Sequence, residues 1–218
     1  MNLGIYTDFR DFYDHWFAGS WQEPAAIFDR RARHGMSRGD MLVWLQDLGF
    51  KVPRFGKVRN LAPVILQEFL CGRGKLSDLV VHFDEAAHAG KGKELLSCCD
   101  ALARFPEAFA TEYIQATRNG AVVSLRYLQI GRRRFWLRYS SSDWRSNCGD
   151  VRIEFLGEEK ILDFCKWIRH PLFALDFLES GGELLALDFN TAPRIQGTGV
   201  EDIMHGKEVY RELSRFFL

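Results

Sequence analysis

The clearest hydrophobic pattern in the chain begins directly after Ser37. Apolar residues there recur every three or four positions, which places them on one face of a helix. Ser37 has the side chain of a typical N-cap, and Gly49 supplies a C-terminal stop. The pattern therefore predicts a helix that ends before Gly49. Its buried face is expected to consist of Met41, Leu42, Trp44, Leu45 and Leu48.

Shorter apolar runs, separated by glycines and polar turns, predict strands along the rest of the chain. Residues 1–36 are rich in aromatics but show no clean period, so we expect a short N-terminal cap there. Helices interleaved with hairpin-linked strands indicate an α+β fold rather than a doubly wound parallel sheet. The predicted helices are residues 62–71, 158–170 and 200–217, and the predicted strands are residues 78–83, 109–115, 122–130, 134–140 and 151–155.

The tetrapeptide ALDF occurs twice around a Gly-Gly turn near the end of the chain. Because side chains alternate between the two faces of a strand, Asp176 and Asp188 should share the face opposite the apolar residues. In regular pairing, only a loop with an odd number of residues puts these two carboxylates opposite each other. A two-residue turn would pair Asp176 with Leu187 instead. We therefore predict a three-residue loop at residues 181–183.

Two carboxylates at cross-strand distance repel each other unless a cation lies between them. Asn190 follows on the same face, so Asp176, Asp188 and Asn190 form a set of oxygen ligands. Such ligands suit Mg²⁺, which usually keeps its other positions for water and phosphate oxygens. The alternative is a half-exposed hairpin whose polar residues face water. Periodicity alone leaves both interpretations open.

A second candidate phosphate site is the Gly-Lys-Gly-Lys run at residues 90–93. Glycines let backbone amides approach a phosphate, and Lys91 or Lys93 would supply the positive charge. The same short pattern also occurs in ordinary exposed turns, so the run by itself does not decide between the two.

Composition excludes several classes of protein. Lys+Arg and Asp+Glu number 29 each, so no net charge attracts the protein to nucleic acid or to an anionic membrane. The five cysteines show no C-x-x-C spacing, which argues against a zinc site or a disulfide framework. The first residues lack the basic and apolar regions of a signal peptide, and no apolar run approaches the roughly 18 residues of a membrane span. We therefore expect a cytoplasmic protein without membrane contact.

Several motifs together resemble the ATP-grasp superfamily, in particular its RimK-type ATP-dependent carboxylate-amine ligases. The run LDFLESGGELLALDFNTAP resembles the end of the catalytic core, where an acid and a turn precede E-V-N-x-x-P-G. The tetrapeptide WRSN at residues 144–147 is similar to F-R-S-N, and TEYIQ at residues 111–115 is similar to the hinge strand beside adenine. VVHFDEAAHAGKGKELL resembles VVKP followed by a glycine-rich loop. These motifs occur in the family's order between Ser37 and Leu218.

The resemblance implies an ATP-grasp fold, in which two α+β subdomains with antiparallel sheets clasp a nucleotide cleft. It implies a nucleotide-binding subdomain at residues 37–116 and a catalytic, metal-binding subdomain at residues 117–218, with residues 1–36 as a remnant of the preceding domain. ATP and Mg²⁺ are the implied cofactors. The implied catalytic residues are Arg138 and Arg145, the implied nucleotide-binding residues are His82, Lys91, Lys93, Glu112, Tyr113, Ile114 and Asn147, and the implied metal ligands are Asp176, Asp188 and Asn190.

The function implied by the resemblance is a ligase that joins a carboxylate, of a small molecule or of a protein or peptide, to an amine through an acylphosphate. One departure favours an alternative: His82 stands where the family has a lysine. The alternative is a degenerate ATP-grasp protein that binds nucleotide and serves as a regulatory or interaction module. RNA binding through residues 132–134 is a weaker hypothesis, because charge clusters at hairpin turns are usually solvated. The aromatic residues 1–36 are a candidate surface for a protein partner or a second copy of the chain.

Overall fold

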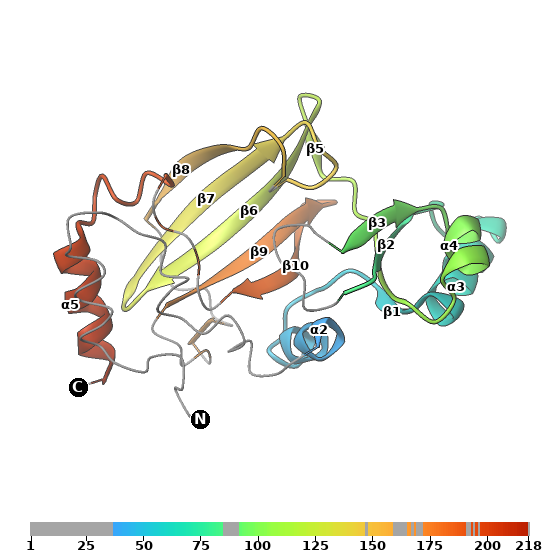
Figure 1. Ribbon diagram of the computed structural model, residues 1–218, viewed down its shortest axis with the longest axis horizontal. Helices are drawn as coiled ribbons and strands as arrows, with labels where there is room; N and C mark the ends of the chain where they lie inside the picture. The colour runs from blue at the N-terminus through green and yellow to red at the C-terminus, as the bar shows by residue number, and fades with distance from the viewer. Residues whose placement is uncertain are drawn as a thin grey trace.

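Two antiparallel sheets, connected through residues 113–116, form the fold (Figure 1). The computed structural model describes residues 37–84, 92–146, 148–158, 165–166, 168, 172–190, 193, 195 and 197–217. The expected cap at residues 1–36 and the predicted site residues Lys91 and Asn147 lie outside the described residues. Most of the helix predicted at residues 158–170 lies outside them as well.

The smaller sheet has four antiparallel strands and is covered by two helices (Figure 1). Its elements are β1 (Phe55–Lys57), α3 (Val58–Leu70), β2 (Leu79–His82), β3 (Lys93–Leu96), α4 (Cys98–Arg104) and β4 (Phe109–Glu112). The strand order is β1-β4-β2-β3. Leu79, Val81 and Ala110 pack against α3 and α4. Alternation along β2 therefore leaves Val80 and His82 on the other face of the sheet.

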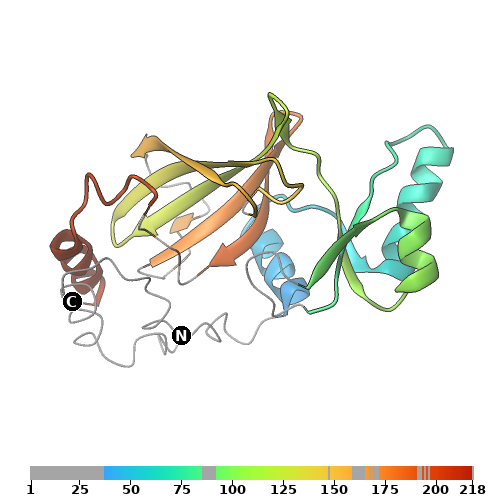
Figure 2. The same cartoon turned by 45° about the horizontal axis from the view of Figure 1, so that its top comes forward.

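The larger sheet carries a helix on each side. Its strands are β5 (Thr117–Arg118), β6 (Ala121–Ile130), β7 (Arg133–Ser141), β8 (Arg152–Glu158), β9 (Leu172–Ser180) and β10 (Glu183–Asn190), in the order β10-β9-β6-β7-β8 with β5 paired to β6. Helix α2 (Arg38–Asp47) lies beside β10 between the two sheets, and α5 (Gly206–Phe217) lies at the far end (Figures 1 and 2). No helix of the described chain is both long and apolar enough to cross a membrane.

The structure confirms the helix predicted after Ser37. Ser37 and Asp40 form a capping box, in which each side chain accepts a hydrogen bond from the other residue's backbone N–H. Helix α3 begins at Val58, four residues before the predicted start. The helix predicted from residue 158 is wrong at its beginning, because Glu158 is the last residue of β8. Helix α5 begins at Gly206, later than predicted, after a series of turns.

The β9–β10 hairpin places Asp188 opposite Asp176, but by a different route from the predicted one. The turn contains only Gly181 and Gly182, whose φ angles of 60° and 80° fit a type I′ turn. The predicted three-residue loop is therefore wrong. A β-bulge at Leu187 adds one residue to β10 and shifts the register, which brings the two acids opposite each other.

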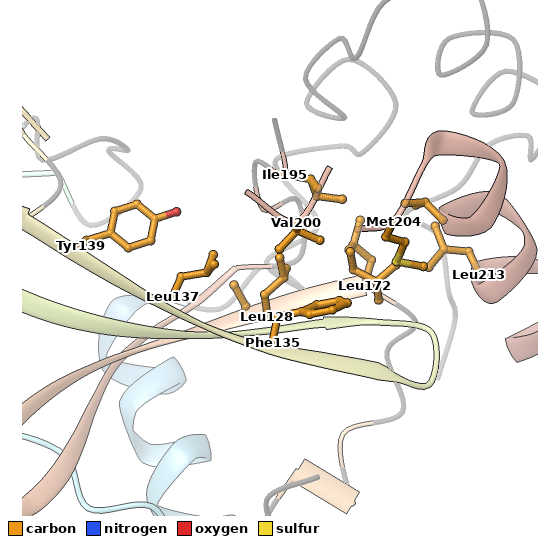
Figure 3. Packing of buried hydrophobic residues seen from close by; sticks show 12 residues of the cluster. Leu128, Phe135, Leu137, Tyr139, Leu172, Ile195, Val200, Met204 and Leu213 are labelled. Carbon is orange, nitrogen blue, oxygen red and sulfur yellow. The ribbon is translucent and has the colours of Figure 1, made fainter. Parts of the chain in front are cut away.

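A row of buried apolar side chains runs from α5 along one face of the larger sheet (Figure 3). Leu213 and Met204 lie at one end of this row, Phe135 lies near its middle, and Tyr139 lies at the other end (Figure 3). Tyr139 thus joins the packed core to polar groups, because its hydroxyl accepts a hydrogen bond from Arg126 at 3.2 Å.

Candidate functional site

A pocket lies between the two sheets, and its walls come from both sheets and from α2. Its lining includes four basic residues, Arg38, Lys93, Arg126 and Arg145, and three acidic residues, Glu112, Asp176 and Asp188. The lining also includes the predicted residues His82, Tyr113 and Ile114. The fold therefore brings together residues from motifs that are far apart in the sequence.

Asp176 is bound by Arg126, which pairs with it across β9 and β6. Arg126 Nε lies 2.6 Å from Asp176 Oδ1 and Arg126 Nη2 lies 2.8 Å from Asp176 Oδ2, so the contact is bidentate. The two side chains are only 11% and 17% exposed. Burial disfavours the charged guanidinium, but the neighbouring Asp176 carboxylate outweighs burial and raises the pKa of Arg126 above its ordinary value.

Asp188 faces a second arginine, Arg38 of α2. Arg38 Nη2 lies 3.8 Å from Asp188 Oδ1, and Arg38 Nη1 donates a hydrogen bond to the carbonyl oxygen of Leu187 at 3.4 Å. The bulge that sets the register of Asp188 is thus held by the same arginine that faces its carboxylate.

The predicted magnesium ligands lie on one face of the hairpin. Asp188 pairs with Asp176, and Asn190 follows two residues later on β10, although it is not part of the pocket lining. The described residues contain no cluster of three or more His, Cys, Asp or Glu side chains suited to a metal. Two carboxylates and one amide fit Mg²⁺ only as a partial shell, which is the usual arrangement when phosphate oxygens and water supply the remaining ligands.

His82 and Lys93 stand opposite each other on β2 and β3, and both line the pocket. His82 is 7% exposed, and its Nε2 has no hydrogen-bond partner among the described residues. Burial, and then the charges of Arg38 and Lys93, lower the pKa of His82 to about 3, so its ring is neutral. The pKa of Lys93 is lowered by burial and by Arg38, against the attraction of Asp188.

The predicted hinge runs along the end of β4. The Glu112 carboxylate accepts hydrogen bonds from Arg54 Nε at 2.8 Å, from Arg54 Nη2 at 3.0 Å and from the Ser77 hydroxyl at 2.8 Å. Both of its oxygens are therefore engaged by protein groups, and the implied role of Glu112 in nucleotide binding stays a prediction. Ile114 follows two residues later, and its N–H makes no hydrogen bond within the described chain.

Of the two arginines predicted to act in catalysis, only Arg145 lines the pocket. Asp143 accepts hydrogen bonds from its Nε and Nη2 at 2.8 Å each, which lowers the pKa of Asp143 to about 2. Arg138 instead donates to Glu154 Oε2 at 2.7 Å. Because Tyr139 lines the pocket, alternation along β7 turns Arg138 to the opposite face. The structure therefore does not bring Arg138 to this site.

Sequence reasoning missed Arg126 and Arg38 and gave no role to Trp144. Arg126 was detectable, because a charged side chain in the middle of the apolar residues 121–130 demands an anionic partner once buried. Arg38 gave no such signal, since an arginine in the first turn of a helix is usually exposed. Trp144 lies in the pocket wall, 6.2 Å from the ring centroid of Tyr113 and edge-on to it.

Solved structures with a similar fold include two ATP-grasp ligases and a macrocyclase. The ATP-grasp ligase PsnB complexed with minimal precursor is 18% identical over 86% of this chain and 62% of its own, with a TM-score of 0.57. A RiPP-associated ATP-grasp ligase from Chryseobacterium gregarium, in complex with ADP and a leader and core peptide, is 14% identical over 82% of this chain and 58% of its own, with a TM-score of 0.52. The macrocyclase MdnC from Microcystis aeruginosa MRC, bound with precursor peptide MdnA, is 12% identical over 86% and 62%, with a TM-score of 0.51.

These likenesses concern the fold. The chain spans about three fifths of the length of the structures it matches. No protein-family model matches the sequence, and comparison with curated proteins gives no significant match. The structural matches show that the chain has an α+β fold like that of ATP-grasp ligases, with antiparallel sheets on both sides of the pocket.

Proposed function

We propose that the pocket binds ATP and that the protein is an ATP- and Mg²⁺-dependent ligase of the RimK type, which joins a carboxylate to an amine. The observation that carries this proposal is the convergence of four basic side chains and the Asp176–Asp188 pair on one pocket between the sheets of an ATP-grasp fold. In this proposal residues 37–116 form the nucleotide-binding subdomain and residues 117–218 the catalytic one. Helix α2 belongs to the first of these ranges but packs against the larger sheet.

The nucleotide base is assigned to the hinge side of the pocket. Tyr113 and Ile114 line it there, and the Ile114 N–H is a donor for a ring nitrogen of adenine. Val80 and Leu178 add apolar surface from the two sheets. Apolar walls with a few backbone donors are typical of sites for flat heterocycles.

The proposed chemistry passes through an acylphosphate. The substrate carboxylate attacks the γ-phosphorus, ADP leaves, and the amine then displaces phosphate and loses a proton. Arg145, oriented by Asp143, and Arg126, oriented by Asp176, are the guanidinium groups placed to balance the charge of the transferring phosphoryl. Arg138 has no part in this proposal, because it lies on the other face of the sheet.

The metal part of the proposal rests on the hairpin. Asp176, Asp188 and Asn190 would hold Mg²⁺, which when bound neutralises charge on the β- and γ-phosphate oxygens. The chain's own contribution is alignment, because the bulge at Leu187 sets Asp188 opposite Asp176.

Small-molecule and peptide carboxylates are both candidate substrates. The similar structures named above contain precursor or leader and core peptides, which makes an acidic peptide the first class to test here. A cytoplasmic location, the absence of membrane and nucleic-acid partners, and an additional partner bound through residues 1–36 remain proposals from the sequence.

A second candidate function has a specific observation in its favour. His82 is neutral and both oxygens of Asp176 are engaged by Arg126, so two charges that ligation would use are absent or already paired. A degenerate ATP-grasp protein, which binds nucleotide as a regulatory or interaction module, would tolerate both features.

Trapping of the acylphosphate distinguishes the two functions. The protein is incubated with ATP, Mg²⁺ and hydroxylamine, together with free amino acids or an acidic peptide, and hydroxamate and ADP are measured. The ligase proposal predicts hydroxamate that depends on the added carboxylate and is lost in Asp188→Asn. Glu179→Gln, an exposed carboxylate of the same hairpin, is the matched control and should retain activity. ATP binding without hydroxamate from any carboxylate would favour the degenerate protein.

A further inference from the structure

His82 occupies a position where a charged side chain would be costly. It is 7% exposed at the end of β2, and burial and two nearby cations keep its ring neutral. His82 nevertheless lines the pocket, and its Nε2 has no hydrogen-bond partner among the described residues. A buried polar nitrogen without a partner costs stability, so a ligand that satisfies it is expected.

Lys93 is the residue directly across the ladder from His82. Directly opposite side chains of antiparallel strands have Cβ atoms about 5 Å apart and lie on the same face. Lys93 Nζ lies 5.8 Å from the ring centroid of Trp144, which belongs to the larger sheet's side of the pocket, so the ammonium reaches into the space between the sheets. A lysine at either position of this pair would therefore deliver its charge to the same part of the pocket.

Lys93 is partly buried, and within the described chain its ammonium makes no ion pair. Removal of an ammonium from water is unfavourable unless an anion compensates for it. Arg38 is also near and adds repulsion. The arrangement is thus a preformed cationic site that is stabilised when an anion enters the pocket.

We propose that the cation that binds the nucleotide's phosphates has moved across the ladder from β2 to β3: Lys93 supplies the charge, and His82 donates a hydrogen bond beside it. This inference deepens the proposed function and rests on it. A lysine at both positions would place two ammonium groups side by side next to Arg38, so a neutral residue at position 82 is what a charged Lys93 requires. His82 is then no sign of degeneration, because the pair retains one positive charge.

Charge relocation tests the proposal. ADP and adenosine binding are measured by calorimetry in the presence of EDTA, so that the result does not depend on the metal ligands. The variants are Lys93→Met, His82→Lys and the double variant, and Lys75→Met, an exposed lysine between α3 and β2, is the control. Circular dichroism confirms that each variant is folded.

Lys93→Met is expected to weaken ADP binding about ten- to hundredfold, the range for a lost hydrogen bond to a charged group, and to leave adenosine binding unchanged. The double variant should recover most of this loss, whereas His82→Lys alone should not tighten binding. Lys75→Met should bind both ligands as the wild type does. The relocation alone is overturned if Lys93→Met binds ADP as tightly as the wild type does, or if the folded double variant binds ADP no more tightly than Lys93→Met. A wild-type protein that binds neither ligand overturns the proposed function and the relocation with it.

Discussion

Replacement of Arg126 by methionine removes the partner of a buried carboxylate. The Arg126–Asp176 pair is bidentate at 2.6 and 2.8 Å, and both side chains are largely shielded from water. Methionine keeps much of the volume of the arginine side chain, so the change removes mainly charge and hydrogen bonds. Asp176 is left with an uncompensated charge at a largely buried position.

The expected cost follows from this burial. Breaking a buried, hydrogen-bonded ion pair by removal of one partner typically costs about 3–5 kcal/mol, whereas replacement of both partners by apolar residues is often neutral. We therefore expect Arg126→Met to lose about 3–5 kcal/mol of unfolding free energy, and Arg126→Met/Asp176→Leu to lose less than Arg126→Met. Arg138→Met is the matched control, because Arg138 pairs with Glu154, which is 52% exposed, on the other face of the same sheet. An exposed pair of this kind contributes at most about 1 kcal/mol.

Urea unfolding at pH 7 without nucleotide, followed by circular dichroism, measures these differences. The reasoning is refuted if Arg126→Met and Arg138→Met lose the same small amount. It is also refuted if the double variant is less stable than Arg126→Met, because that result would show that the two side chains contribute independently rather than as a pair.

Two further predictions concern stability. A Cβ at Gly131 (φ 57°) would lie 2.5 Å from the backbone oxygen of Glu212, so Gly131→Ala should cost about 2 kcal/mol or more of unfolding free energy and loosen α5. Gly120 also has a positive φ but open space around it, so Gly120→Ala should cost only about 1 kcal/mol. Thermal unfolding of both variants tests this, and equal losses would contradict it. Burial alone would raise the pKa of Glu112, but hydrogen bonds from Arg54 and Ser77 outweigh burial and lower it. The ionised carboxylate therefore stabilises the fold at pH values above its unfolded pKa of about 4.3, and this contribution disappears as the pH falls through the lowered folded pKa. The stability difference between wild type and Arg54→Met should therefore shrink below about pH 4, and a constant difference down to pH 2 would contradict the assignment.

The hairpin shows what alternation along a strand can and cannot predict. The shared face of Asp176 and Asp188 was predictable, because each acid stands between two apolar residues that were expected on the opposite face, Leu175 and Phe177 for Asp176 and Leu187 and Phe189 for Asp188. The register that brings the two acids opposite each other was not predictable, because Gly181-Gly182 favours a two-residue turn and nothing local marks Leu187 as a bulge. The stability of a bulge depends on its tertiary contacts, and here the Leu187 carbonyl accepts a hydrogen bond from Arg38, which is far away in the sequence.

The arginines show a similar limit. The motif resemblance placed Arg138 at the site, yet the face of β7 is set by its pairing with β6 and β8, and this pairing turns Arg138 toward Glu154. Helix α2, by contrast, was predictable because Ser37 and Asp40 cap it through local hydrogen bonds. Helix capping depends on a few adjacent residues, whereas the set of residues that line the pocket depends on which strands become neighbours.

Calorimetric titration of ATP, with and without Mg²⁺, into wild type and Asp188→Ala tests the central claim most directly. The account predicts that wild type binds ATP, that Mg²⁺ tightens this binding, and that Asp188→Ala loses the gain from Mg²⁺ while it remains folded. A wild-type protein that does not bind ATP, or whose ATP affinity is the same with and without Mg²⁺ and with and without the Asp188 carboxylate, would contradict it.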